Sequence, residues 1–411
     1  MDDLHLIGGR HWETLAPINI AVGNGRISAA GPETLSGAAR ERVDLNGYLV
    51  SPAFVEPHYH LDKALITAGS SPGTTFEEQI AAVGFSKKDY TEENVEARAE
   101  QVLRILIRRG VTSVRSFADV DSHVGLTALK GLLRLRERWH ESIDIQLVAF
   151  PQHGLFADRQ ALVLLRGAID AGADLIGGHP QLEVDEAAGL RQIETLFDLA
   201  ASHDLDLDFH VDETDLADSR WLDRVVDATL RRGWQGRVCV SHCISLAKRT
   251  PNERHALYAE LRRAGITVVS SPTSGLLFRG HGDVDPTRGI VPVRELLAAG
   301  IPVACAQEVY RSVFAPNLRY PDPVYTAQIM AYAAKLSDDD GLRSVWRMVT
   351  TVPAAALRIP DYGLHVGSRA NLVCFQAPSL DDIFGRLTTN RMVFRRGRLI
   401  ATSRFEEGLW V

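Results

Sequence analysis

The chain has 411 residues, of which 45% are hydrophobic, and a formal charge of −7 at neutral pH. This composition is typical of a soluble globular protein, and the mild acidity argues against binding to nucleic acid or to an anionic membrane surface. The N-terminal residues carry no basic head followed by an apolar run, and no apolar run approaches the ~20 residues that span a bilayer. We therefore expect a cytoplasmic protein without a membrane segment.

Strand-like pieces occur near both termini, at residues 4–7, 18–22, 371–375, 392–394 and 399–400. Asn24-Gly25 lies between two apolar runs, which is a strong signal for a β-hairpin. Neither end is large enough for a core of its own, so we predict one small β-sandwich domain built from residues 1–50 and 363–411. Two independent edge hairpins are the alternative. The basic stretch at 395–398 is interpreted as a solvated turn.

Between the two ends, apolar strands alternate with amphipathic helical patterns. The predicted strands are residues 49–55, 111–117, 143–150, 173–177, 205–210, 237–242, 266–270 and 301–305. One predicted helix begins after Thr91, which is a suitable N-cap, and ends at Gly110. Eight strands that alternate with helices predict an α/β fold, namely a (β/α)8 TIM-type barrel over residues 51–362.

The active site of such a barrel lies at the carboxyl ends of its strands. Polar residues follow several of the predicted strands: His58 and His60 after the first, Gln152 after the third, His210 and Glu213 after the fifth, His242 after the sixth and Glu308 after the eighth. Each of these residues alone has an ordinary structural explanation, such as a satisfied core histidine or a helix cap. Their placement at one mouth favours a common site.

The residue types at these strand ends indicate a metal site. His58 and His60 are two residues apart, so in an extended strand both side chains point to the same face. With His210 and Glu308 they offer three imidazoles and one carboxylate to a single divalent ion, and zinc or iron suits this set. A water molecule in the open position would be activated by the ion.

The remaining polar residues fit a hydrolytic reaction on a small molecule. Glu213 is placed to move a proton from the activated water to a leaving nitrogen. His242 can polarise a carbonyl or hold the attacking hydroxide. Gln152 has both a donor and an acceptor, which suits an amide or lactam edge. The four cysteines, Cys239 among them, show no zinc-type spacing and are expected to be reduced thiols.

Several segments resemble the amidohydrolase superfamily, and within it the branch of cytosine deaminase and N-isopropylammelide isopropylaminohydrolase. They are residues 54–62, 148–152, 210–213, 241–243, the end of the eighth strand and 363–372. The resemblance implies one divalent metal ion and loss of ammonia or an amine from a cytosine-like or triazine-like ring by attack of metal-bound hydroxide. It also implies that Phe314 lies against the substrate ring. The fourth strand runs into Gly177-Gly178-His179 and has no lysine to bridge a second ion.

The chain departs from this branch at two strand ends. Glu308 stands where the family has an aspartate, and the extra methylene moves the carboxylate on the order of 1.5 Å further out. It can bind the ion if the backbone retreats, or it can project past the ion. Phe117 stands where the branch often has a histidine. The alternatives are therefore a cyclic amide hydrolase of the same superfamily, or a catalytically impaired pseudo-enzyme. A homo-oligomer is left open.

Overall fold

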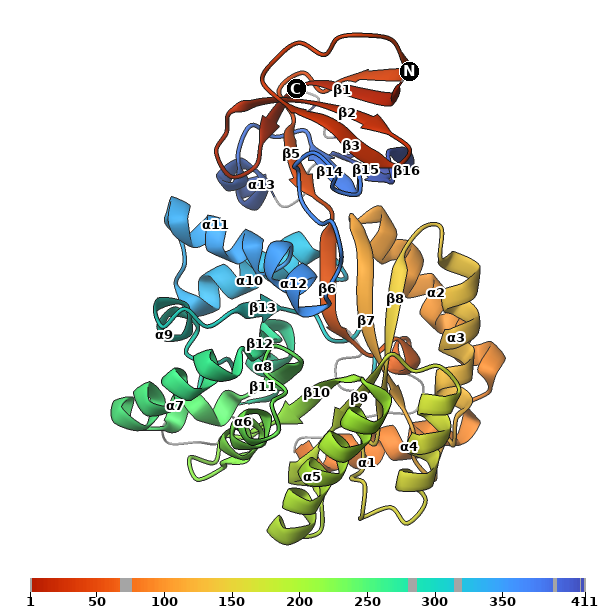
Figure 1. The fold of residues 1–411 in the computed structure, drawn as a ribbon, viewed down its shortest axis with the longest axis vertical. Helices are drawn as coiled ribbons and strands as arrows, with labels where there is room; N and C mark the ends of the chain where they lie inside the picture. The colour runs from red at the N-terminus through yellow and green to blue at the C-terminus, as the bar shows by residue number, and fades with distance from the viewer. Residues whose placement is uncertain are drawn as a thin grey trace.

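The computed structural model describes residues 2–66, 76–279, 287–313, 320–386, 390–406 and 408–409. Its strands form two eight-stranded sheets, which occupy the upper and lower parts of Figure 1. The upper sheet contains β1 (Asp2–His11), β2 (Pro17–Gly23), β3 (Arg26–Gly31), β4 (Ala39–Asp44), β5 (Leu49–Pro52), β14 (Leu372–Phe375), β15 (Arg391–Arg395) and β16 (Arg398–Ser403). The lower sheet contains β6 (Phe54–Tyr59), β7 (Val111–Asp119), β8 (Asp144–Phe150), β9 (Leu175–Gly178), β10 (Asp206–Val211), β11 (Val238–His242), β12 (Thr267–Ser270) and β13 (Val303–Cys305).

Helices surround the lower sheet and connect its strands (Figure 1). The α-helices are α1 (Phe76–Ser86), α2 (Glu92–Arg108), α3 (Thr127–Trp139), α4 (Ala161–Asp170), α5 (Glu186–His203), α6 (Trp221–Arg231), α7 (Pro251–Ala264), α8 (Pro272–Phe278), α9 (Val293–Ala298), α10 (Pro323–Ala334), α11 (Asp339–Arg347), α12 (Thr351–Ala356) and α13 (Leu380–Arg386). Short 3-10 helices are η1 (Leu61–Lys63), η2 (Lys87–Asp89), η3 (Pro180–Leu182) and η4 (Ile244–Lys248). Among the described helices, none is both long enough and apolar enough to cross a membrane.

The lower sheet is a nearly closed parallel barrel. Its strands follow the chain order from β6 to β13, with every neighbouring pair parallel. The first and last strands meet just beyond their ends, where Tyr59 pairs with Glu308 and the His60 amide donates to the Glu308 carbonyl at 2.7 Å. The predicted (β/α)8 barrel is confirmed, and the carboxyl ends of all eight strands converge on one mouth.

Helix α2 shows how the sequence specifies the outer layer. Thr91 caps it by accepting a hydrogen bond from the Asn94 amide at 3.2 Å. Its buried residues recur at helical spacing and pack against the barrel: Val95, Ala99, Val102, Leu103, Leu106 and Ile107. Gly110 follows with φ of +95°, a left-handed conformation that favours glycine. Capping, periodicity and termination are all visible in the sequence.

The upper sheet is built from both ends of the chain, as predicted. Its β2–β3 hairpin turns at Asn24 and Gly25, both with positive φ. β5 pairs with β1 and with β14, so it joins the N-terminal and C-terminal strands. The expected first barrel strand, residues 49–55, is in fact two strands: β5 lies in the upper sheet and only β6 enters the barrel. The predicted boundary between the two domains, at residue 50, falls within β5. The domain boundaries therefore remain a prediction.

The expectation of a solvated turn at 395–398 is wrong for Arg395. Its side chain is buried, its guanidinium lies 2.8 Å from the Asp144 carboxylate, and it also donates to the His140 carbonyl at 3.0 Å. Arg396 and Arg398 are exposed, as expected for a turn. Because Asp144 begins barrel strand β8, this arginine ties the upper sheet to the barrel.

Candidate active site

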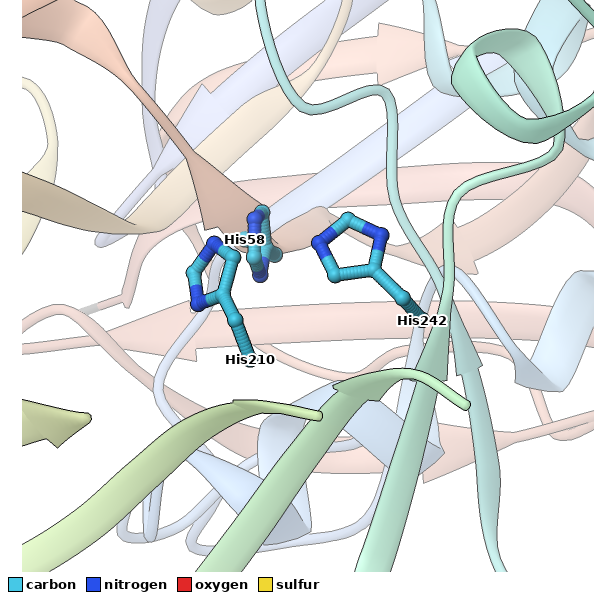
Figure 2. Close-up of side chains that lie close together, drawn as sticks. All are labelled: His58, His210 and His242. Carbon is cyan, nitrogen blue, oxygen red and sulfur yellow. The ribbon is translucent and has the colours of Figure 1, made fainter. Parts of the chain in front are cut away.

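The barrel mouth brings together three histidines from three different strands. His58 lies near the end of β6, His210 near the end of β10, and His242 ends β11. Each offers a ring nitrogen, and these three atoms lie within 4.8 Å of one another (Figure 2). All three side chains are buried. Two of them were predicted as metal ligands, whereas His242 was predicted to act on the substrate or the hydroxide.

Neighbouring side chains fix the orientation of the imidazoles. His58 Nδ1 lies 2.8 Å from Ser241 Oγ, which leaves Nε2 directed away from that contact. Such a second contact orients metal-binding histidines in many proteins. Lys63 donates to His60 Nδ1 at 3.1 Å, and His60 Nε2 lies 3.4 Å from His210 Nε2. Because an ammonium can only donate, His60 Nδ1 is the acceptor in this contact.

The histidines fit a divalent ion. Within the described part of the chain, no hydrogen-bond partner reaches His58 Nε2, His210 Nδ1 or His242 Nε2, although all are buried. Burial and neighbouring positive groups hold the pKa of His58, His60 and His210 well below its ordinary value. These rings are therefore neutral at pH 7, as metal binding requires.

Glu213 lies beside the histidines with a second, unpredicted partner. One carboxylate oxygen is 3.8 Å from His242 Nε2, and the other is 3.2 Å from Arg279 Nη2. Burial alone would raise the pKa of Glu213, but His242 and Arg279 hold it below its ordinary value. The carboxylate is thus ionised at neutral pH and can accept a proton. Sequence reasoning missed Arg279, which follows the short helix α8 and shows no local pattern.

Gln152 is buried at the end of β8 and has a fixed orientation. Its Oε1 accepts from Lys63 Nζ at 2.8 Å, and its Nε2 lies 3.3 Å from His179 Nδ1. Since an ammonium only donates, the contact with Lys63 fixes the orientation of the Gln152 amide, with its oxygen towards Lys63. Lys63 lies three residues after His60 in the sequence, but its position gave no hint of this contact.

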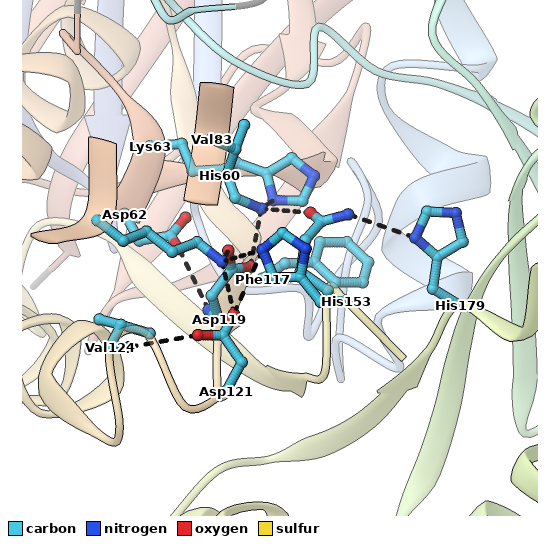
Figure 3. Close-up of polar contacts among 12 residues, drawn as sticks. His60, Asp62, Lys63, Val83, Phe117, Asp119, Asp121, Val124, His153 and His179 are labelled. Atoms are coloured by element: carbon cyan, nitrogen blue, oxygen red, sulfur yellow. Dashed lines mark hydrogen bonds and ion pairs between the residues drawn. The ribbon is translucent and has the colours of Figure 1, made fainter. Parts of the chain in front are cut away.

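A buried charged network supports the ammonium group of Lys63 (Figure 3). Asp119 lies 2.8 Å from Lys63 Nζ and 2.5 Å from Lys87 Nζ, and Lys87 also pairs with Asp121 at 2.6 Å. Sequence reasoning missed this network, because buried charges cannot be told from exposed ones by residue type. The ion pairs hold Lys63 in position between His60 and Gln152.

Phe117 packs against three of the histidines at the mouth. Its ring centroid lies 4.4 Å from that of His58, 4.7 Å from that of His210 and 5.2 Å from that of His60. This apolar ring replaces the histidine expected at the end of strand β7 and offers no ligand atom there. The predicted substrate contact Phe314 lies outside the described residues.

Glu308 lies at the end of the eighth strand, at the edge of the mouth. Its side chain is buried, and its carboxylate accepts a hydrogen bond from the Ser274 hydroxyl. In the described residues, the carboxylate is not grouped with the three clustered histidines, and neither is His60. The ligand roles of Glu308 and His60 therefore stay predictions.

Comparisons with known proteins agree with this geometry. Residues 68–401 match the model of the amidohydrolase family. The chain is 30% identical to a pterin deaminase of Rhizobium rhizogenes over 96% of this chain and 90% of the relative. It is 29% identical to the N-isopropylammelide isopropyl amidohydrolase of Pseudomonas sp., with 89% of each chain covered. The crystal structure of 5-methylcytosine deaminase from Klebsiella pneumoniae with 5-fluorocytosine superposes with a TM-score of 0.94, at 29% identity and 99% coverage of both chains.

Proposed function

This chain belongs to the amidohydrolase family, and on that premise we propose that it removes an exocyclic amino group from a small heterocycle with the help of one zinc or iron ion. The family is metal-dependent, and the similar proteins named above act on pterin, ammelide and cytosine compounds. We extend to this chain the class they share, an amino-substituted pyrimidine, triazine or pterin-type ring.

One observation carries the proposal: three buried imidazoles converge beside an ionised carboxylate, Glu213. An ion held by His58, His60, His210 and Glu308 would supply Lewis-acid chemistry and lower the pKa of a bound water towards neutrality. The ligand set is our prediction, and His242 is a further nitrogen within reach of the same point.

The chain's own residues would then carry the proton and orient the ring. Glu213 accepts a proton from the attacking water and passes it to the leaving nitrogen, so that a carbon–oxygen bond forms as the carbon–nitrogen bond breaks. The Nε2 of His242 lies 3.8 Å from the Glu213 carboxylate, which supports a role for His242 in stabilising the oxygen that attacks there. Gln152 presents its Lys63-oriented amide to the ring edge, and Phe314 is proposed to stack on the ring.

An ammonia-release assay on a panel of aminopyrimidines, aminotriazines and pterins tests this function. We expect one class to yield stoichiometric ammonia with the ring intact by mass spectrometry. A ring-opened product without ammonia would instead identify a cyclic amide hydrolase. Absence of both products from metal-loaded protein across the panel would contradict the proposal and favour a catalytically impaired pseudo-enzyme.

A further inference from the structure

Helix α8 braces the end of the eighth strand through two adjacent hydroxyls. Thr273 Oγ1 donates to the Gln307 carbonyl at 3.0 Å, and Ser274 Oγ donates to the Glu308 carboxylate. Both hydroxyl-bearing residues are buried. The first contact holds the backbone of the strand end, whereas the second holds the side chain of Glu308.

The backbone at Glu308 shows that its position is imposed by its surroundings. Its φ is +81°, in the left-handed region that a residue with a side chain rarely adopts. Such a conformation persists only where neighbouring contacts determine it. Here the His60 amide donates to the Glu308 carbonyl at 2.7 Å, and Ser274 holds the carboxylate. Glu308 is therefore held by hydrogen bonds at both its backbone carbonyl and its side-chain carboxylate.

Helix α8 can act as a brace because its own position is fixed. A Cβ atom added at Gly275 would overlap the carbonyl oxygen of Gly289, so the two backbones are in direct contact. Only glycine permits so close an approach. Ser274 immediately precedes this contact point, which leaves its hydroxyl little freedom to move away from Glu308.

We propose that Ser274 is a positioning residue for Glu308. Its hydroxyl holds one carboxylate oxygen and so gives the longer side chain a single orientation at the strand end. In this way the chain accommodates glutamate where its relatives were expected to carry the shorter aspartate. The expected effect of Ser274 on catalysis rests on the proposed function. Its expected effect on metal affinity does not, because that effect follows from the hydrogen bond to Glu308.

The test is a double-mutant comparison of S274A in the Glu308 and E308D backgrounds. With Glu308 present, we expect S274A to lower kcat about tenfold or more at nearly constant KM, or to lower zinc affinity by the same factor. Losses of this size are typical when a residue that hydrogen-bonds to a metal ligand is replaced. In the E308D background the shorter side chain does not reach the hydroxyl, so S274A should change either quantity by less than about threefold. Zinc affinity is measured by competition with a chelator, and thermal unfolding checks that each variant is folded.

The T273V variant is the matched control, because it removes the neighbouring hydroxyl without touching Glu308. A similar loss in T273V would show a general weakening of α8 and overturn the proposal. So would an S274A protein with unchanged kcat and zinc affinity, or an equal loss in both Glu308 and E308D backgrounds. If wild-type protein releases no ammonia from any substrate, the proposed function fails, and zinc affinity alone decides the role of Ser274.

Discussion

At the scale of single residues, the proposed proton transfer depends on Glu213. The carboxylate lies between His242 and Arg279, and these neighbours keep its pKa below the ordinary value despite burial. An ionised carboxylate is the form that accepts a proton from water. Arg279 lies near one carboxylate oxygen and His242 near the other, so both oxygens of Glu213 have a neighbour that limits their orientation.

Replacing Glu213 with glutamine should abolish turnover without loss of the metal. The amide keeps the shape of the side chain but cannot accept the proton, so we expect kcat to fall by roughly 10²-fold or more. Ammonia release and metal content are measured on the same preparation. E137Q, on the exposed face of helix α3, is the matched control. Near wild-type turnover in E213Q would show that another group carries the proton.

The sequence predicted the residues that bear a local signal and missed those defined by distant contacts. His58, His210 and His242 follow recognisable strands, and the structure brings them together. Arg279 pairs with Glu213 across the mouth, and Arg395 pairs with Asp144 across the two sheets. Neither arginine differs by its sequence context from a solvated one, so only the tertiary structure could reveal its role.

At the scale of elements, the alternation of strands and helices was readable but the change of sheet was not. Residues 49–55 form one apolar run, because β5 and β6 are both buried. Burial in the upper sheet and burial in the barrel select the same residue types. The pattern therefore could not show that the chain leaves one sheet at Pro52 and enters the other at Phe54. β5 instead pairs with β14 of the C-terminal segment.

The upper sheet is joined to the barrel helices by Arg391 on β15. Its guanidinium forms two hydrogen bonds to the Asp322 carboxylate, at 2.9 and 3.1 Å, and donates to the Arg109 carbonyl at 2.9 Å. Asp322 also caps α10 by accepting from the Val324 amide at 3.0 Å. Both partners are buried, so the loss of one would leave an uncompensated charge.

We expect R391M to lower the free energy of unfolding by about 3–5 kcal/mol, the cost of breaking a buried ion pair from one side. Equilibrium urea unfolding gives this value. R398M, on the next strand, is the matched control. Arg398 is exposed, so its replacement leaves no buried carboxylate unpaired and should change the free energy of unfolding by less than about 0.5 kcal/mol. Equal denaturation midpoints for R391M and R398M would show that the ion pair contributes nothing measurable to the joint between sheet and barrel.

At the scale of the whole molecule, the barrel supplies a rigid ring of strand ends and the upper sheet steadies its first strand. Strand β6 carries His58 and continues directly from β5, while β14 holds β5 from the C-terminal side. The two ends of the chain thus converge on the strand that brings the first predicted ligands to the mouth. This arrangement explains why residues so far apart in sequence can define one small site.

The most direct measurement of the central claim is ammonia release by the same enzyme before and after metal removal. The protein is stripped with a chelator, assayed on the best substrate of the panel, and reconstituted with zinc or iron(II) in steps. We predict that the stripped protein is inactive and that activity returns fully at one equivalent of metal, but not in E213Q. Full activity in metal-free protein, or activity that continues to rise well beyond one equivalent, would contradict a single-ion deaminase.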